Sequence, residues 1–143
     1  MHDVRATLMQ GRNSDGQPVR RPLSPHLQVY KPQISSVLSI FHRLSGVALT
    51  GGVVVLALWL AAAAESPHTF LIAQRLVDSF AGQLVLFGFT VMLFYHFCNG
   101  IRHLLWDAGY GFDLSTMHRT GYIVIGATLL LAALAWVVGF AIG

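Results

Sequence analysis

The segment SFAGQLVLFGFTVMLFYHFCNGI, residues 79–101, contains no Asp, Glu, Lys or Arg. At about 1.5 Å rise per residue, a helix of this length crosses the roughly 30 Å of a bilayer's hydrocarbon core. Two other segments, residues 44–64 and 120–143, have a similar length and also lack Asp, Glu, Lys and Arg. The sequence therefore predicts three transmembrane helices.

The composition of the whole chain agrees with this interpretation. Of 143 residues, 55% are hydrophobic and only 10% are charged, which leaves too little polar surface for a water-soluble globule. The fold class expected is an all-α integral membrane protein. The single cysteine, Cys98, lies in the second segment, so the chain cannot build a disulfide or a cysteine-based zinc or iron–sulfur site. Any redox centre must use histidine or a partner chain.

The distribution of positive charge predicts the orientation in the membrane. The N-terminal arm and the second loop together hold eight Lys and Arg residues, whereas the first loop holds only Arg75. Because positive charge marks the inner side, we expect the N-terminus in the cytoplasm or matrix. No presequence is evident, so we expect the bacterial inner (cytoplasmic) membrane rather than the mitochondrial inner membrane. The same asymmetry is explained by topology and does not indicate nucleic-acid binding.

The chain divides into an arm and a membrane domain. Residues 1–33 form the arm, whose first 20 residues are expected to have no fold of their own. Prolines 22, 25 and 32 keep the rest of the arm extended as a docking strap. Residues 34–143 form the membrane domain, with spans at about 36–64, 79–106 and 117–142. Ser35 or Ser36 is expected to cap the first helix, and Ser115 or Thr116 the third.

One face of the second helix carries polar residues at its inner end. His96, Gly100, His103 and Asp107 recur at helical spacing. Ionisable groups are costly in hydrocarbon, and a histidine costs least there when it is neutral and a ring nitrogen binds a metal. His96 is therefore a candidate ligand, at a depth of roughly 9 Å that suits a haem iron. Asp107 is a candidate ion-pair partner or proton relay.

A matching polar face lies at the same end of the first helix, at Ser39, His42 and Arg43. The propionates of a haem can reach back toward His42, Arg43 or His103 near the polar surface. Ser39 and Arg43 can donate hydrogen bonds, and Arg43 can stabilise a reduced quinone. The two faces together predict a haem and quinone region.

Two motifs carry a resemblance to a known family. They are RPLSPHLQVY (21–30) followed by SIFHRLSG (39–46), and His96 followed by GIRHLLWDAG (100–109). With these motifs the chain resembles the large cytochrome b membrane-anchor subunit of succinate dehydrogenase, respiratory complex II. No residue of the two motifs departs from the family pattern at the candidate site.

The resemblance implies a role for each motif. His96 would be an axial ligand of one haem b, and the small membrane-anchor subunit would supply the second histidine. Ser39 and Arg43 would belong to the ubiquinone pocket, with His42 and Arg43 near the haem propionates; His103 and Asp107 also match the motif. The three helices would join a multi-subunit helical bundle in the lipid bilayer. Succinate would be oxidised on a flavoprotein subunit, and electrons would pass through an iron–sulfur subunit to ubiquinone, without covalent catalysis by this chain.

Three alternatives stay open at this point. A haem-free membrane anchor would use His96 only as a packed polar residue. The anchor of a quinol:fumarate reductase would have the same parts and run the reaction in reverse. A small transporter or channel component is disfavoured, because the chain lacks inverted repeats and has no acidic residue in mid-membrane.

Overall fold

The structure, a computed structural model, describes residues 10–21 and 31–142. Two compact units make up the chain, Met1–Pro32 and Gln33–Gly143. The expected docking strap lies mostly in residues 22–30, outside the described residues.

The N-terminal unit contains a short antiparallel hairpin, which was not predicted from the sequence. Strand β1 (Gln10–Arg12) pairs with strand β2 (Pro18–Arg20). The turn between them is built by Asn13, whose side-chain oxygen accepts a hydrogen bond from the backbone N–H of Gln17 at 2.8 Å. Gly16 adopts a φ of 77°, which glycine takes without strain. The expectation that residues 1–20 have no fold is therefore wrong for residues 10–20.

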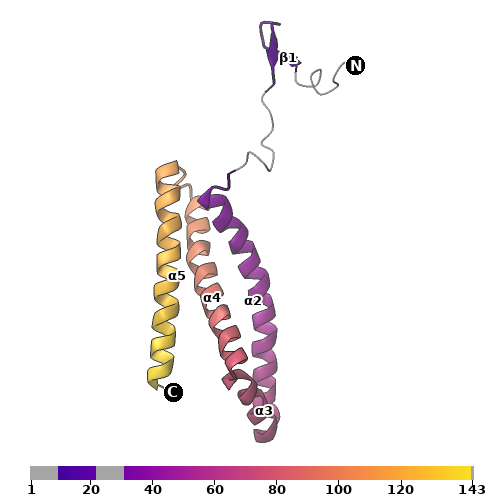
Figure 1. Ribbon diagram of the computed structural model, residues 1–143, viewed down its shortest axis with the longest axis vertical. Coiled ribbons are helices and arrows are strands. Elements are labelled where there is room, and N and C mark those ends of the chain that lie inside the picture. The colour runs from indigo at the N-terminus through magenta and orange to yellow at the C-terminus, as the bar shows by residue number, and fades with distance from the viewer. Residues whose placement is uncertain (1–9, 22–30, 143) are drawn as a thin grey trace. The chain divides into compact units, whose positions relative to one another are not determined.

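The second unit is a bundle of three long apolar helices, α2 (Ile34–Glu65), α4 (Phe80–Asp107) and α5 (Leu114–Ile142). Helix α4 lies between α2 and α5, as Figure 1 shows. The amphipathic helix α3 (Pro67–Asp78) connects α2 to α4. The predicted fold class, an all-α membrane protein, is confirmed.

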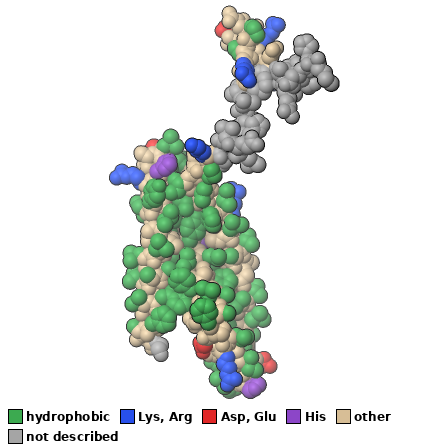
Figure 2. Space-filling model, viewed as in Figure 1, with side chains coloured by type: hydrophobic (Ala, Val, Ile, Leu, Met, Phe, Trp, Pro, Cys, Tyr) green, Lys and Arg blue, Asp and Glu red, His purple; other side chains and the backbone are tan. Residues whose placement is uncertain are grey.

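The outer surface of this bundle is mostly hydrophobic. In Figure 2 apolar side chains cover the long helices, and charged side chains gather toward their ends. Phe80 and Val47, for example, are 87% and 75% exposed. The hydrocarbon tails of lipids solvate apolar side chains well, whereas water does not. A surface of this kind is therefore explained by contact with a bilayer.

Small residues allow the helices to approach closely. A Cβ on Gly121 of α5 would lie 3.0 Å from the side chain of Leu38 in α2. A Cβ on Gly52 of α2 would lie 3.0 Å from the ring of Phe89 in α4. Because lipid gives little hydrophobic drive for association, such close packing provides much of the attraction between membrane helices.

Arg102 joins α4 to the start of α5. Its side chain is only 3% exposed, and Nε donates to the hydroxyl of Thr120 at 3.0 Å while Nη2 donates to the Met117 carbonyl at 2.9 Å. Its guanidinium also lies 4.1 Å from the ring centroid of Trp106. Arg102 therefore fastens the two helices together at the end where the α4–α5 loop begins.

The helix caps differ from those expected. Helix α2 begins at Ile34 after Gln33, which makes no side-chain cap hydrogen bond, so Ser35 and Ser36 lie inside the first turn. Helix α5 is capped by Asp113, whose carboxylate accepts from the backbone N–H of Thr116 at 3.0 Å and from the Ser115 hydroxyl at 3.2 Å. Hydrogen bonds from the side chain and backbone of Thr116, and from Ser115, hold the pKa of the Asp113 carboxyl below its ordinary value.

The contacts of Arg102 generate a first prediction. Replacing Arg102 by Leu removes two hydrogen bonds from a charged donor and should lower the free energy of unfolding by about 2 kcal/mol or more. Thermal unfolding of the purified complex measures this loss. Arg119, an exposed arginine of α5, is the matched control, and Arg119→Ala should change stability by no more than about 0.5 kcal/mol. An equal loss of unfolding free energy in the two variants would contradict the conclusion that Arg102 stabilises the packing of α4 against α5.

The cap of α5 generates a second prediction. Asp113→Ala should speed backbone hydrogen exchange in the first turn of α5, whereas Asp113→Asn, which keeps a side-chain oxygen, should not. Because folding lowers the pKa of this carboxyl, its stabilising effect is present above the ordinary value of 3.8 and is lost as the pH falls through the lowered value. The wild type should therefore lose protection relative to Asp113→Asn in acid. Identical exchange in all three proteins would show that Asp113 is not the cap.

Candidate functional site

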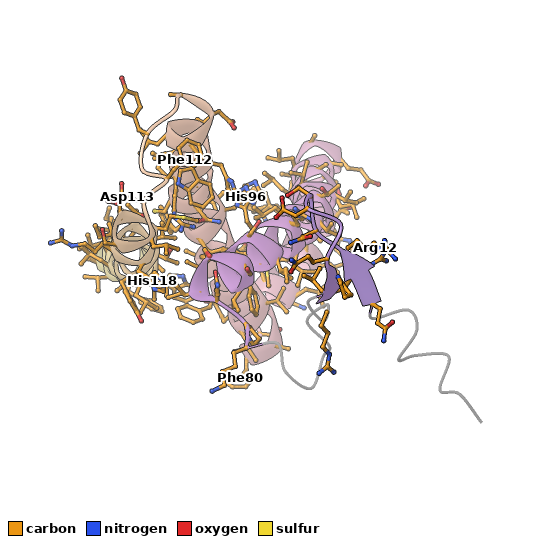
Figure 3. The ribbon with its side chains drawn as sticks, turned by 90° about the horizontal axis from the view of Figure 1, so that it is seen from above. Arg12, Phe80, His96, Phe112, Asp113 and His118 are labelled. Carbon is orange, nitrogen blue, oxygen red and sulfur yellow. The ribbon has the colours of Figure 1, made fainter. Side chains whose placement is uncertain are left out.

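The site is built around His96 of α4, whose imidazole is held by α2. Its Nδ1 lies 3.0 Å from the hydroxyl oxygen of Ser45 and 3.1 Å from the backbone carbonyl oxygen of His42. In Figure 3, which views the ribbon from above, His96 is labelled where α4 faces α2. Among the described residues the His96 ring makes these two hydrogen-bond contacts, and both involve Nδ1.

Three histidines form a column of rings between α2 and α4. The ring of His42 stacks on that of His96, with centroids 4.1 Å apart and an interplanar angle of 11°. The ring centroid of His42 also lies 4.8 Å from that of His103, and the rings of His103 and Trp106 are nearly perpendicular, with centroids 5.0 Å apart. His42, from the polar face predicted on the first helix, therefore lies against His96 and His103 of the polar face predicted on the second.

Two glycines make room for this column. A Cβ on Gly46 of α2 would lie 3.1 Å from Cε1 of His96, and a Cβ on Gly100 of α4 would lie 3.7 Å from Cε1 of His42. Each glycine thus stands opposite a histidine of the other helix. The helical spacing placed Gly100 on the same face as His96 and His103, and the ring that comes close to it there is His42.

Two ring nitrogens in the column are buried without a hydrogen-bond partner among the described residues. They are Nδ1 of His42 and Nε2 of His103. Leaving a buried polar atom unpaired costs about 1–3 kcal/mol, so such atoms usually have a partner in the working molecule. The column can therefore offer hydrogen bonds to a bound group.

The remaining predicted residues lie at the same end of the bundle. Ser39 is half-buried, and Arg43 and Asp107 are exposed. Within the described residues none of these side chains forms a hydrogen bond with the rest of the chain, so the ion pair or relay at Asp107 stays a prediction. Ser39 and Arg43 are four residues apart on α2 and share a helix face.

A second polar face of α4 was not predicted from the sequence. The hydroxyl of Tyr95 donates to the Leu38 carbonyl of α2 at 2.6 Å, and the amide of Asn99 reaches the same oxygen at 3.3 Å. Asn99 is fully buried. Tyr95, Asn99 and Arg102 follow the i, i+4, i+7 spacing, which is the signal that could have identified this face.

Ser45 was also missed, because a lone serine in an apolar helix is an ordinary feature of membrane sequences. It is 5% exposed. Its position three residues after His42 was the available signal, since a serine hydroxyl often bonds to the carbonyl of the preceding turn.

Chemically, the arrangement offers one oriented imidazole nitrogen and several hydrogen-bond donors at one end of a membrane bundle. The described residues contain no group of three or more His, Cys, Asp and Glu side chains placed to hold a metal ion.

Comparison with known proteins agrees with the resemblance carried by the two motifs. Residues 17–135 match the family model described as the succinate dehydrogenase/fumarate reductase transmembrane subunit. The succinate dehydrogenase cytochrome b556 subunit of Rickettsia prowazekii is 44% identical over 118 residues, which are 82% of this chain and 92% of that protein.

Two further relatives have similar sequence identity and coverage. The cytochrome b556 subunit of Paracoccus denitrificans is 42% identical, over 84% of this chain and 92% of the relative. The cytochrome b560 subunit of Reclinomonas americana is 38% identical, over 84% and 87%. Since the family model covers most of the sequence, the chain belongs to the succinate dehydrogenase/fumarate reductase transmembrane subunit family.

Proposed function

We propose that this chain is the cytochrome b membrane anchor of a succinate dehydrogenase complex, where it co-ligates one haem b and forms part of the ubiquinone-reduction site. The observation that carries the proposal is the orientation of His96, whose Nδ1 is engaged by α2 while no hydrogen bond within the described chain uses Nε2. The relatives named above are cytochrome b subunits of succinate dehydrogenase, which supports the same function.

The residues of the column fit a haem. The lone pair of an imidazole nitrogen lies in the plane of the ring, so the His42 ring stacked on the face of His96 leaves Nε2 free as an axial ligand. The second histidine ligand would come from the small anchor subunit. The unpaired nitrogens of His42 and His103, together with Arg43, are the proposed partners of the propionates. Haem b, when bound, supplies a one-electron redox centre.

The proposed ubiquinone pocket uses Ser39 and Arg43. A hydroxyl and a guanidinium on one helix face can donate hydrogen bonds to the two kinds of quinone oxygen, carbonyl and reduced anion. Both residues lie on the first three turns of α2, near the polar surface where protons are available. Asp107, at the end of α4, is the proposed proton relay or ion-pair partner. The chain forms no covalent bond to substrate.

The partners and the orientation complete the proposal. A flavoprotein subunit oxidises succinate, and an iron–sulfur subunit passes the electrons to ubiquinone beside this chain. The arm, residues 1–33, lies on the cytoplasmic side of a bacterial inner membrane, and residues 34–143 form the anchor. The alternative of a quinol:fumarate reductase has less support, since the relatives named above are succinate dehydrogenase subunits, although the family model covers both.

The haem assignment makes a prediction for His96. Replacing His96 by Tyr should remove one axial ligand and abolish the low-spin b-type absorption of the reduced, purified complex. His118→Tyr, at an exposed histidine of α5, is the matched control and should leave the spectrum intact. A wild-type complex without a b-type band would favour the haem-free anchor. An unchanged low-spin spectrum in His96→Tyr would show that another histidine is the ligand.

The quinone assignment makes a prediction for Arg43. Arg43→Ala should lower succinate-driven ubiquinone reduction about 100-fold, because a charged donor to the reduced quinone is lost. Succinate oxidation with an artificial acceptor should change little, since that reaction does not use the pocket. Ser39→Ala should raise the KM for ubiquinone without loss of haem, and Arg119→Ala should behave as wild type. Equal losses of both activities in Arg43→Ala would indicate misassembly instead of a pocket defect.

A further inference from the structure

We infer that Ser45 is a positioning residue that fixes the tautomer and the orientation of His96, so that Nε2 is the nitrogen presented to a metal. This inference rests on the proposed function, because it names what holds the proposed haem ligand in place. It assigns a role to a side chain that neither sequence motif indicated as functional.

The Ser45 hydroxyl oxygen is one corner of a triangle of three polar atoms that are all within hydrogen-bond distance of one another. This oxygen lies 2.8 Å from the carbonyl oxygen of His42 and 3.0 Å from Nδ1 of His96, and that nitrogen lies 3.1 Å from the same carbonyl oxygen. The triangle is enclosed, with Ser45 only 5% exposed. Water is therefore poorly placed to substitute for any of these contacts.

The positions of the protons follow from the chemistry of the three groups. A carbonyl oxygen only accepts hydrogen bonds, so both short contacts to the His42 carbonyl need a proton on the other atom. The Ser45 hydroxyl supplies its single proton to one contact, and the other requires the proton of His96 to be on Nδ1. The opposite tautomer would set the Nδ1 lone pair against the carbonyl oxygen at 3.1 Å. In the neutral ring the remaining lone pair is then on Nε2.

The consequence for a metal ligand is both geometric and electronic. A histidine that donates its other ring N–H to an oxygen is held in one orientation and becomes a more basic ligand, and losing such a partner typically costs 10–100-fold in metal affinity. Gly46 supports the same arrangement, because a Cβ there would lie 3.1 Å from Cε1 of His96, and the ring would have to shift by a few tenths of an ångström.

Ser45 differs in this respect from Thr50 and Thr128, two other hydroxyl-bearing residues of the long helices. The hydroxyl of Thr50, five residues along α2, donates to the Gly46 carbonyl at 3.0 Å, and that of Thr128 in α5 donates to the Val124 carbonyl at 2.7 Å. Both bond only within their own helix. Ser45 makes the same kind of bond within α2 and, in addition, contacts a ring of α4.

The test compares haem retention in the purified complex. Ser45→Ala should raise the rate of haem transfer to apomyoglobin about 10-fold or more and shift the low-spin electron paramagnetic resonance signal. Thr50→Val, the matched loss of a hydroxyl from the same helix, should retain haem as the wild type does. Succinate oxidation with an artificial acceptor should be unchanged in both, which shows that the complex is assembled.

A second pair of variants probes the same contact by steric displacement. Gly46→Ala should also speed haem release, whereas Gly51→Ala, where nothing lies within 4 Å of the added Cβ, should not. Suppose that Ser45→Ala and Gly46→Ala both keep the wild-type haem-transfer rate and electron paramagnetic resonance signal, while His96→Tyr loses haem. This result would overturn the role of Ser45 but leave His96 as the proposed ligand. A full b-type spectrum in His96→Tyr would overturn the proposed ligand, and the inference with it.

Discussion

Hydrocarbon offers no hydrogen bonds, so each polar side chain that enters the three long helices needs a partner from within the protein. In this chain threonine hydroxyls find a partner within their own helix, and the larger polar side chains find theirs on a neighbouring helix. Tyr95 and Asn99 of α4 meet at the Leu38 carbonyl of α2, and Arg102 of α4 reaches the first turns of α5. The requirement for partners therefore produces the contacts that hold α2, α4 and α5 together at one end of the bundle.

The same end holds the histidine column, so stability and the candidate site share one region. Gly46 and Gly100 let α2 and α4 approach closely enough for the rings of His96 and His42 to stack. Without that approach, Nδ1 of His96 would not reach the oxygens of α2. The opposite half of the bundle packs through aromatic and small residues. There the rings of Phe87 and Trp136 lie edge to face, with centroids 5.4 Å apart.

Hydropathy and helical periodicity could predict much of this arrangement, because both act within a single helix. Segment length predicted the three long helices, and the spacing of His96, Gly100 and His103 predicted a common face. Periodicity cannot say how one helix is rotated against the next, since that depends on packing between segments distant in sequence. The contact of Ser45 with His96 and the carbonyl shared by Tyr95 and Asn99 were hidden for this reason.

Errors near the helix ends have a more local cause. Asp113, Ser115 and Thr116 are all residues that cap helices well, and the choice among them depends on where the chain leaves the α4–α5 loop. Asp113 takes the role because its carboxylate reaches the free N–H of Thr116. The hairpin at residues 10–20 was missed because its strands are only three residues long and carry little apolar pattern.

The energetics of the column also bear on assembly. Nδ1 of His42 and Nε2 of His103 are buried with no partner in the described chain, and each such atom costs about 1–3 kcal/mol. A bound group that supplies their hydrogen bonds would recover this energy only in the folded bundle, and would therefore stabilise it by mass action. If that group is the proposed haem, whose second ligand belongs to the small anchor, then haem binding and the joining of the two anchors must be thermodynamically coupled. The unpaired nitrogens of one chain would thus favour the complete complex over the isolated subunit.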